Sequence, residues 1–258
     1  MRIVERPSPN YEARESPVAF VVLHYTGMQD AETALARLCD PEPMAGRYPG
    51  PWQDPALDPE TRLGRASSHY CVAEDGTIYR LVPEDKRAWH AGLSSWKGKV
   101  GLNDCSVGIE IVNGGHDFGL PDFPEVQIKT VIDLVREILA RHKLTASDVV
   151  GHSDIAPERK YDPGEKFPWR RLAEEGVSVW PRAASFEGLE TLSPGQTGEA
   201  VAALQRDLAA FGYGLPQTGV YDPMTQTVVD SFQRRFRPER IDGIADGKTR
   251  ALLHALLR

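Results

Sequence analysis

Three side chains that can bind a metal ion stand at two places in the sequence. The segment GHSDIAPERKYDPG, residues 151–164, holds His152, Lys160 and Asp162 in a stretch that contains two prolines. His24 follows an apolar run and could supply a third ligand. Two imidazoles and one carboxylate, with a fourth position left to water, form a ligand pattern of catalytic zinc. Taken singly, each residue also fits an ordinary role, as a hydrogen-bonding histidine or as a turn aspartate before a proline.

Short apolar runs predict the strands that would position these residues. We expect strands at residues 19–23, 69–73, 77–82, 106–112 and 149–150. The second and third are joined by the tripeptide EDG, which is typical of a hairpin turn. Within the run SVGIEIV, successive side chains alternate between the two faces of the strand. Glu110 is therefore expected to face the side opposite Ile109 and Ile111.

Helical spacing of apolar residues predicts two helices in the first part of the chain. One covers residues 30–38, with Asp30 as its N-cap. The other covers residues 125–142, where Asp122 and Glu125 resemble a capping pair. Pro- and Gly-rich residues 40–65 and the segment 153–169 are expected to form irregular loops. Strands and helices that alternate in this way indicate an α/β (α+β) domain ending near residue 176.

Four motifs resemble one known family. They occur in the family's order: VVLHYTG at 21–27, WHAG at 89–92, GIEIVN at 108–113 and GHSDIAPERKYDPG at 151–164. Residues 17–176, approximately, are similar to the AmpD-like zinc N-acetylmuramoyl-L-alanine amidases (the amidase type 2 family). This resemblance implies a central mixed β-sheet flanked by helices.

The resemblance also implies roles for individual residues. His24, His152 and Asp162 would be zinc ligands, Glu110 the catalytic acid and base, and Lys160 an electrophilic partner. The implied reaction is hydrolysis of the amide bond between N-acetylmuramic acid, or its 1,6-anhydro form, and L-alanine. Zinc suits this reaction because it polarises a carbonyl and lowers the pKa of its bound water to about 7.

Other polar and aromatic residues near the motifs are candidates for contact with the substrate: Tyr25, His69, Trp89, His90 and Asn113. The histidines among them, and His116, could instead be alternative ligands or support the ligands, and a tryptophan fits a protein core as well as a sugar-binding surface. We expect His142, on the apolar side of the long helix, to be structural. Two other hydrolase classes are excluded, because the chain has neither His-Glu-x-x-His nor Gly-x-Ser-x-Gly.

The last part of the chain reads as a separate helical unit. Residues 177–194 are predicted to be a linker, and residues 195–258 a small three-helix domain. Its segments VAALQRDLAAFGY, TGVYDPMTQTVVDSFQ and DGIADGKTRALL resemble the peptidoglycan-binding module found beside many wall hydrolases, although FRPERIDG departs from the usual spacing. The resemblance implies a role in holding glycan or stem peptide. The alternative is that these helices only buttress the catalytic domain.

Composition narrows the partners and the location. The net charge is −7 with no basic patch, so we expect no nucleic-acid partner. The partners that the resemblance implies are peptidoglycan fragments or the sacculus. Three widely spaced cysteines indicate neither disulfides nor a cysteine zinc site. No stretch is long enough to span a membrane, and no signal peptide is visible, which favours the cytoplasm over the periplasm or envelope. A non-catalytic peptidoglycan recognition protein is the alternative function.

Overall fold

The core of the protein is a six-stranded mixed sheet. The computed structural model describes residues 2–48, 57–182 and 188–258. The strand order is β1 (Ile3–Glu5), β5 (Ile78–Arg80), β4 (Tyr70–Val72), β9 (Ser106–Ile111), β3 (Phe20–Tyr25) and β10 (Val149–Gly151). Only β4 and β5 pair antiparallel; the other neighbours are parallel. The central mixed sheet expected from the sequence is confirmed.

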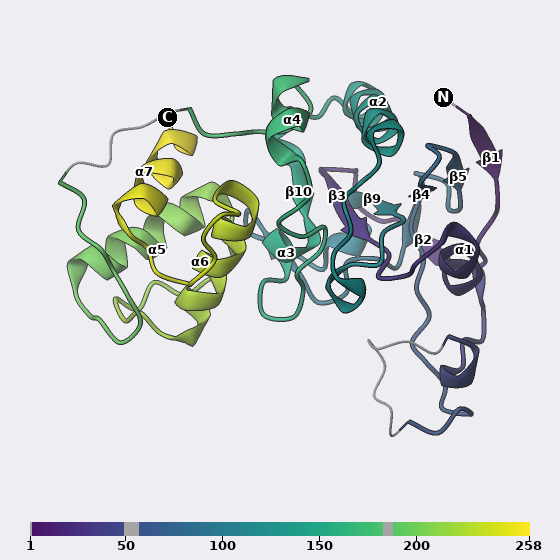
Figure 1. Ribbon diagram of the computed structural model, residues 1–258, viewed down its shortest axis with the longest axis horizontal. Helices are drawn as coiled ribbons and strands as arrows, with labels where there is room; N and C mark the ends of the chain where they lie inside the picture. The colour runs from purple at the N-terminus through teal and green to yellow at the C-terminus, as the bar shows by residue number, and fades with distance from the viewer. Residues whose placement is uncertain (1, 49–56, 183–187) are drawn as a thin grey trace.

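Helices flank this sheet, and two short strand pairs form separate small sheets. The two small sheets pair β2 (Tyr11–Ala13) with β6 (Lys86–Ala88) and β7 (Ser95–Trp96) with β8 (Lys99–Val100). The helices are α1 (Ala31–Cys39), α2 (Glu125–His142), α3 (His152–Ile155), α4 (Trp169–Glu174), α5 (Glu199–Phe211), α6 (Pro223–Phe236) and α7 (Gly247–Leu256). In Figure 1, α5, α6 and α7 gather beyond α3, at the opposite end of the molecule from α1.

Side-chain alternation along the central strands gives the sheet two apolar faces. On one face, Leu23 and Ile109 are fully buried and pack with Val131 and Val135 of α2 in one cluster. Burying a side chain of this size stabilises the fold by about 1.5–3 kcal/mol. The apolar stripe that predicted the helix at residues 125–142 is therefore the surface that covers this face.

The other face of the sheet shares a hydrophobic cluster with the C-terminal helices. Val22 of β3 and Val150 of β10 belong to the same cluster as Leu204, Phe232 and Trp96. The backbone at Gly212, the residue after α5, lies close against the Trp96 ring, since a Cβ on Gly212 would lie 2.6 Å from that ring. Helices α5–α7 are therefore packed onto the rest of the fold through a continuous apolar core.

Two local expectations about helix ends had different outcomes. Asp30 caps α1 as predicted, because its carboxylate accepts a hydrogen bond from the Thr33 N–H at 2.7 Å. The capping pair predicted for α2 is wrong, since Pro124 is the N-cap and no side chain caps this end. The two acidic side chains have other partners instead: Glu125 pairs with Arg171, and Asp122 pairs with Lys166.

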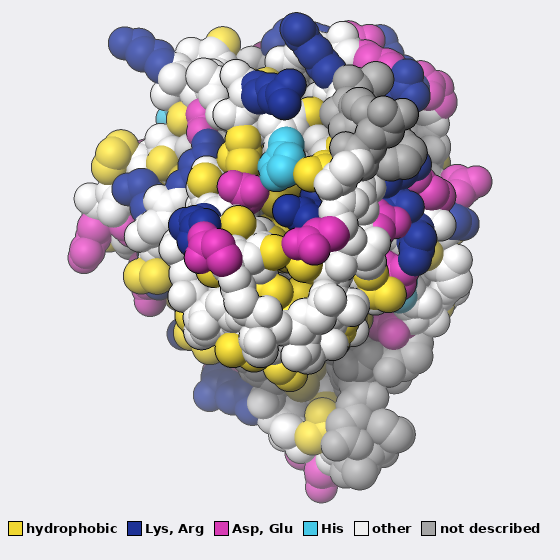
Figure 2. All heavy atoms as spheres, turned by 90° about the vertical axis from the view of Figure 1, so that its left-hand side faces the viewer, with side chains coloured by type: hydrophobic (Ala, Val, Ile, Leu, Met, Phe, Trp, Pro, Cys, Tyr) yellow, Lys and Arg dark blue, Asp and Glu magenta, His cyan; other side chains and the backbone are white. Residues whose placement is uncertain are grey.

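The surface formed by α5–α7 carries charges of both signs. Figure 2 shows this end of the molecule, with basic, acidic and apolar side chains interspersed. Over the residues that the structure describes, every helix is too short or too polar to cross a bilayer.

Candidate metal centre

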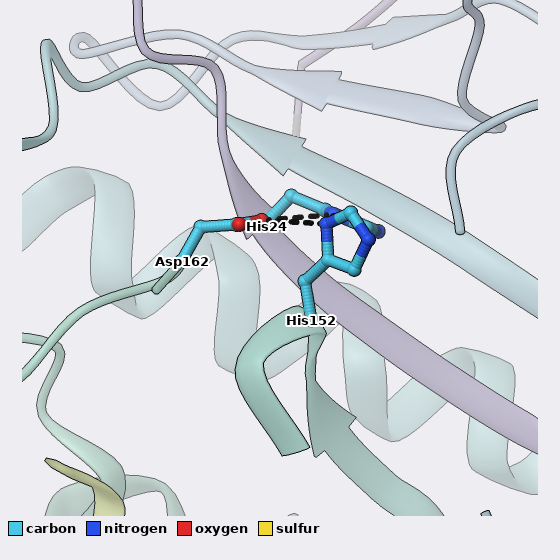
Figure 3. Close-up of side chains that lie close together, drawn as sticks. All are labelled: His24, His152 and Asp162. Atoms are coloured by element: carbon cyan, nitrogen blue, oxygen red, sulfur yellow. Dashed lines mark hydrogen bonds and ion pairs between the residues drawn. The ribbon is translucent and has the colours of Figure 1, made fainter. Parts of the chain in front are cut away.

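Two adjacent strands bring together the two histidines that are candidate metal ligands. β3 and β10 are parallel, and Leu23 pairs with Gly151. His24 and His152 come next along each strand, so the two imidazoles meet at the same edge of the sheet. Asp162 approaches from the loop after α3, which is held by a hydrogen bond from Ser153 N–H to the Asp162 carbonyl at 2.9 Å. Figure 3 shows the three side chains converging from these elements.

The three ligand atoms form a nearly equilateral triangle. The Nδ1 atoms of His24 and His152 are 2.9 Å apart, and each lies 3.0 Å from Oδ2 of Asp162. In a tetrahedral zinc site with bonds of about 2.0 Å, ligand atoms are about 3.3 Å apart. All three residues are buried. The spacing and the chemistry of this donor set therefore fit a zinc ion.

The hydrogen bond at the far side of His152 determines which of its nitrogens is free. Nε2 of His152 lies 3.3 Å from the backbone carbonyl of Ala91. A carbonyl can only accept, so Nε2 must carry the proton and donate it. Nδ1 is then unprotonated, and its lone pair points toward Asp162 and His24. This is the tautomer that a metal ion needs.

A chain of three hydrogen bonds has the same effect on His24. Ser106 Oγ donates to the Leu102 carbonyl at 2.6 Å, so it accepts from Nε2–H of His90 at 3.2 Å. Nδ1 of His90 is therefore free to accept the Nε2–H of His24 at 3.0 Å. This leaves Nδ1 of His24 unprotonated and directed at the ligand triangle.

Burial keeps the imidazoles of His24 and His90, the two histidines in this series of hydrogen bonds, neutral. It lowers the pKa of His24 to about 4, with the neighbouring His152 acting in the same direction. Burial also lowers the pKa of His90 well below its ordinary value. For Asp162, burial opposes ionisation, but interactions with His152 and His24 outweigh it and lower the pKa. A neutral imidazole and an ionised carboxylate are the forms that bind metal.

A glycine in the neighbouring strand makes room for His90. A Cβ atom at Gly108 of β9 would lie 2.5 Å from Cγ of His90. Real side chains do not approach so closely, so the His90 ring can lie against β9 only because residue 108 has no side chain. The motif GIEIVN contains this glycine, but nothing in the sequence identifies the ring that it accommodates.

Glu110 stands beside His24 on the neighbouring strand. The two residues are paired in the parallel register of β3 and β9, so their side chains share a face of the sheet. Oε2 of Glu110 is buried and has no hydrogen-bond partner among the described residues. Burial, aided by the charge of Asp162 and opposed by Lys160, raises the pKa of Glu110 to about 8. An unpaired carboxyl group beside three candidate metal ligands is suited to proton transfer.

A cavity of about 360 Å³ opens onto these groups. Its lining includes His24, His152, Asp162, Glu110 and Lys160, so the structure brings together the five residues for which the sequence predicted catalytic or metal-binding roles. A larger hollow of about 1040 Å³ lies between α5, α7 and residues 179–182. Among the described residues that line this hollow, His254 is the one side chain that could ligate a metal, so the smaller cavity is the candidate active site.

Comparison with known proteins agrees with this geometry. A family model described as N-acetylmuramoyl-L-alanine amidase matches residues 14–165. The chain belongs to this amidase family. A second model, described as a putative peptidoglycan binding domain, matches residues 197–253. The resemblance drawn from the four motifs and from the C-terminal segments is confirmed.

Two curated relatives show how far the similarity extends. The N-acetylmuramoyl-L-alanine amidase AmiD of Escherichia coli (strain K12) is 35% identical over 245 residues, covering 93% of this chain and 82% of AmiD. The 1,6-anhydro-N-acetylmuramyl-L-alanine amidase AmpD of Citrobacter freundii is 35% identical over 180 residues, covering 64% of this chain and 86% of AmpD. The similarity to AmiD thus includes the C-terminal helices.

Two solved structures of the family match the whole fold. The crystal structure of AmpDh3 from Pseudomonas aeruginosa has a TM-score of 0.74 and 35% identity, covering 93% of this chain and 91% of AmpDh3. E. coli AmiD in complex with the substrate anhydro-N-acetylmuramic acid-L-Ala-D-gamma-Glu-L-Lys has a TM-score of 0.72 and 34% identity, covering 95% of this chain and 91% of AmiD.

Three of the five predicted substrate contacts line the cavity of this amidase. They are Tyr25, Trp89 and His90. The Tyr25 hydroxyl lies 2.9 Å from Nδ1 of His116, which places His116 near the site. Because His90 is also hydrogen-bonded to His24, it could orient this candidate metal ligand as well as contact the substrate.

The other two predicted contacts lie outside the set of residues that line this cavity. His69 is buried beside β9, where its Nδ1 accepts a hydrogen bond from Gly108 N–H at 2.9 Å. Asn113 closes a turn, accepting from Gly115 N–H and donating to the Pro121 carbonyl, both at 2.9 Å. Both side chains satisfy backbone groups near the site.

The sequence predictions did not include several groups that the structure places at the site. The Ala91 carbonyl and Ser106 determine the histidine tautomers, and Arg37 of α1 lines the cavity. The WHAG motif includes Ala91, but a backbone acceptor leaves no signal in residue type. His142 bonds to Glu84 at 2.5 Å, away from the cavity lining.

Proposed function

We propose that this amidase is zinc-dependent and hydrolyses the bond between N-acetylmuramic acid, or its 1,6-anhydro form, and L-alanine. The observation that carries the proposal is the triangle of His24, His152 and Asp162, with both imidazole tautomers set for metal binding. The solved complexes of relatives support the substrate class. AmiD holds anhydro-N-acetylmuramic acid-L-Ala-D-gamma-Glu-L-Lys, and AmpDh3 holds an anhydromuramic pentapeptide. Peptidoglycan fragments released in wall recycling or turnover contain this bond.

The ligand triangle would hold the ion through His24, His152 and Asp162. When bound, zinc polarises the amide carbonyl and makes the attacking water more acidic. The hydrogen bonds behind the ligands keep the two imidazoles in place, so the site is formed before substrate arrives. Such preorganisation is what lets a metal centre act without rearrangement during the reaction.

Glu110 would transfer the proton that the reaction moves. Its Oε2 would take a proton from the attacking water and give it to the nitrogen of L-alanine as the amide bond breaks. A general acid and base works best when its pKa is near the operating pH. The burial that raises the pKa of Glu110 to about 8 brings this carboxyl group close to that condition.

Lys160 would stabilise the negative charge that develops on the carbonyl oxygen. It lines the same cavity as Glu110 and lies two residues before Asp162 in the loop. A fixed cation near a developing oxyanion stabilises the transition state more than the ground state. Tyr25 and Trp89, which also line the cavity, would contact the sugar or the stem peptide.

Zinc content and chelation test the metal-dependent part of the proposal. We expect the purified full-length protein to bind one zinc ion per chain, and to lose amidase activity with a chelator and regain it with zinc. His152→Ala should bind no zinc. His142→Ala is the matched control, because this histidine bonds to Glu84 outside the cavity lining. Full activity in chelated protein would refute the proposal, and zinc binding without hydrolysis would favour a non-catalytic recognition protein.

The form of the substrate is tested by comparing two preparations. Release of stem peptide from soluble 1,6-anhydromuropeptide should be measured beside release from intact sacculi, at matched bond concentrations. Faster release from the soluble fragment would place the enzyme in recycling, and faster release from sacculi would place it in turnover of the wall. The cytoplasmic location stays a prediction, which fractionation of cells tests.

A further inference from the structure

A buried ion pair connects helix α6 to the segment that carries His152. Nη1 of Arg235 in α6 lies 2.5 Å from Oδ2 of Asp154 in α3. The Arg235 side chain is 2% exposed and the Asp154 side chain 0%. Asp154 is two residues after His152, so this pair joins the C-terminal helices to the metal centre.

Both members of the pair have further partners that fix the local backbone. Asp154 accepts hydrogen bonds from Gly151 N–H at 2.8 Å and from the Tyr213 hydroxyl at 3.0 Å. Arg235 donates to the Val149 carbonyl at 3.0 Å. The guanidinium therefore holds the start of β10 while the carboxylate holds its end, one residue before His152.

Two more contacts from α6 reach the same loop. Ser231 Oγ donates to the Ser153 carbonyl at 2.7 Å. The Arg234 guanidinium lies 4.7 Å from the centre of the Tyr161 ring. Ser153 follows His152, and Tyr161 precedes Asp162, so α6 touches the immediate neighbours of two metal-ligating residues.

These contacts supply the rigidity that the loop cannot supply alone. Helix α3 has four residues, far fewer than an isolated helix needs to be stable in water. Its conformation must therefore come from tertiary contacts, and α6 and Tyr213 provide the polar ones described above. The position of the His152 imidazole depends on this backbone.

We propose that Arg235 is a positioning residue for the metal centre, acting through Asp154 and the backbone of residues 149–154. On this view, helices α5–α7 help to build the metal site, whether or not they also bind the wall. The inference rests on the zinc site proposed above. Groups that orient metal ligands typically change metal affinity 10- to 100-fold when they are removed.

Zinc affinity of the full-length protein with Arg235→Met tests the proposal. We expect the zinc dissociation constant, measured by competition with a chromogenic chelator, to rise at least tenfold. The matched control is Arg237→Met, because Arg237 at the end of α6 also forms an ion pair, largely buried, with Asp246 at the start of α7. Both variants lose an ion pair that is at least largely buried, but only Arg235 reaches the segment that carries His152. Zinc affinity of the control should stay within twofold of wild type.

The outcomes separate this proposal from the proposed function. If wild type binds no zinc, the proposed function fails. If wild type binds zinc and folded Arg235→Met binds it equally well, or if both variants weaken binding equally, the positioning role fails. Should Arg235→Met not fold, Tyr213→Phe and Ser231→Ala decide, since each removes one hydrogen bond and keeps the ion pair. We expect threefold or greater weakening from each, and unchanged affinity in both would overturn the proposal.

Discussion

Replacing Glu110 with glutamine should lower kcat by at least two orders of magnitude while making the metal-free protein more stable. Glutamine has nearly the same shape as glutamate but cannot take a proton from water. General acid–base catalysis contributes about 10²- to 10⁴-fold to rates, which corresponds to about 3–5.5 kcal/mol in the activation barrier. We expect a loss of kcat in this range, with zinc content unchanged because Glu110 is outside the ligand triangle.

The gain in stability follows from the raised pKa of Glu110. Burial brings its pKa from 4.5 to about 8 in the folded protein, so the native state binds more protons than the unfolded state between these values. The contribution of Glu110 to the stability of the wild type therefore falls as pH rises through this window. At 1.36 kcal/mol for each pKa unit, the destabilisation reaches up to about 5 kcal/mol above pH 8. Glutamine removes this titration, so the advantage of Glu110→Gln should grow with pH.

Two measurements check these expectations separately. Release of stem peptide from a muropeptide at saturating concentration gives kcat for zinc-loaded protein. Urea unfolding of chelated protein at pH 5, 7 and 8.5 gives the stability difference between Glu110→Gln and wild type. A variant that retains more than a tenth of the wild-type kcat would contradict the acid–base role. A stability difference that is the same at all three pH values would refute the reasoning from burial.

Three further variants test the surroundings of the site. His90→Ala removes the acceptor for Nε2–H of His24 and should weaken zinc binding 10- to 100-fold in a chelator competition, whereas unchanged affinity would exclude the tautomer argument. Gly108→Ala places a Cβ 2.5 Å from the His90 ring and should cost about 1–3 kcal/mol in urea unfolding, and a stability equal to wild type would show that His90 moves freely. Burial opposes ionisation of Glu84, but hydrogen bonds led by that from Arg141 lower its pKa from 4.5 to about 2. The stabilisation is therefore present above pH 4.5 and lost toward pH 2. Because these groups are partly exposed, Glu84→Gln should cost about 1–2 kcal/mol at pH 7 and less at pH 3, and an equal cost at both would contradict this.

The sequence predicted those features of the site that depend on residue type and local pattern. His152 and Asp162 lie in one short motif, and strand alternation placed Glu110 opposite Ile109 and Ile111. Parallel strands ending at one edge then bring His24 to the same point. The individual strands and the long helix followed from apolar runs and periodicity, which report directly on which side chains are buried, whereas the central mixed sheet was implied by the family resemblance.

Long-range pairing was beyond the reach of the same reasoning. Arg235 and Asp154 are 81 residues apart, and neither differs in type from an ordinary surface residue. The error at the start of α2 has a similar origin, since Asp122 has the right type for a cap but pairs with Lys166 instead. Residue type shows what a side chain can bond to, whereas the fold decides which partner it meets.

The apolar core shared between the sheet and helices α5–α7 has a consequence for the order of events during synthesis. The ribosome makes His24, His152 and Asp162 before it makes α6, whose Phe232 completes that core and whose Arg235 reaches β10. The loop that carries His152 and Asp162 therefore lacks the contacts from α6 in a growing chain until α6 has emerged. The proposed metal centre is therefore expected to gain this support only after α6 has been synthesised.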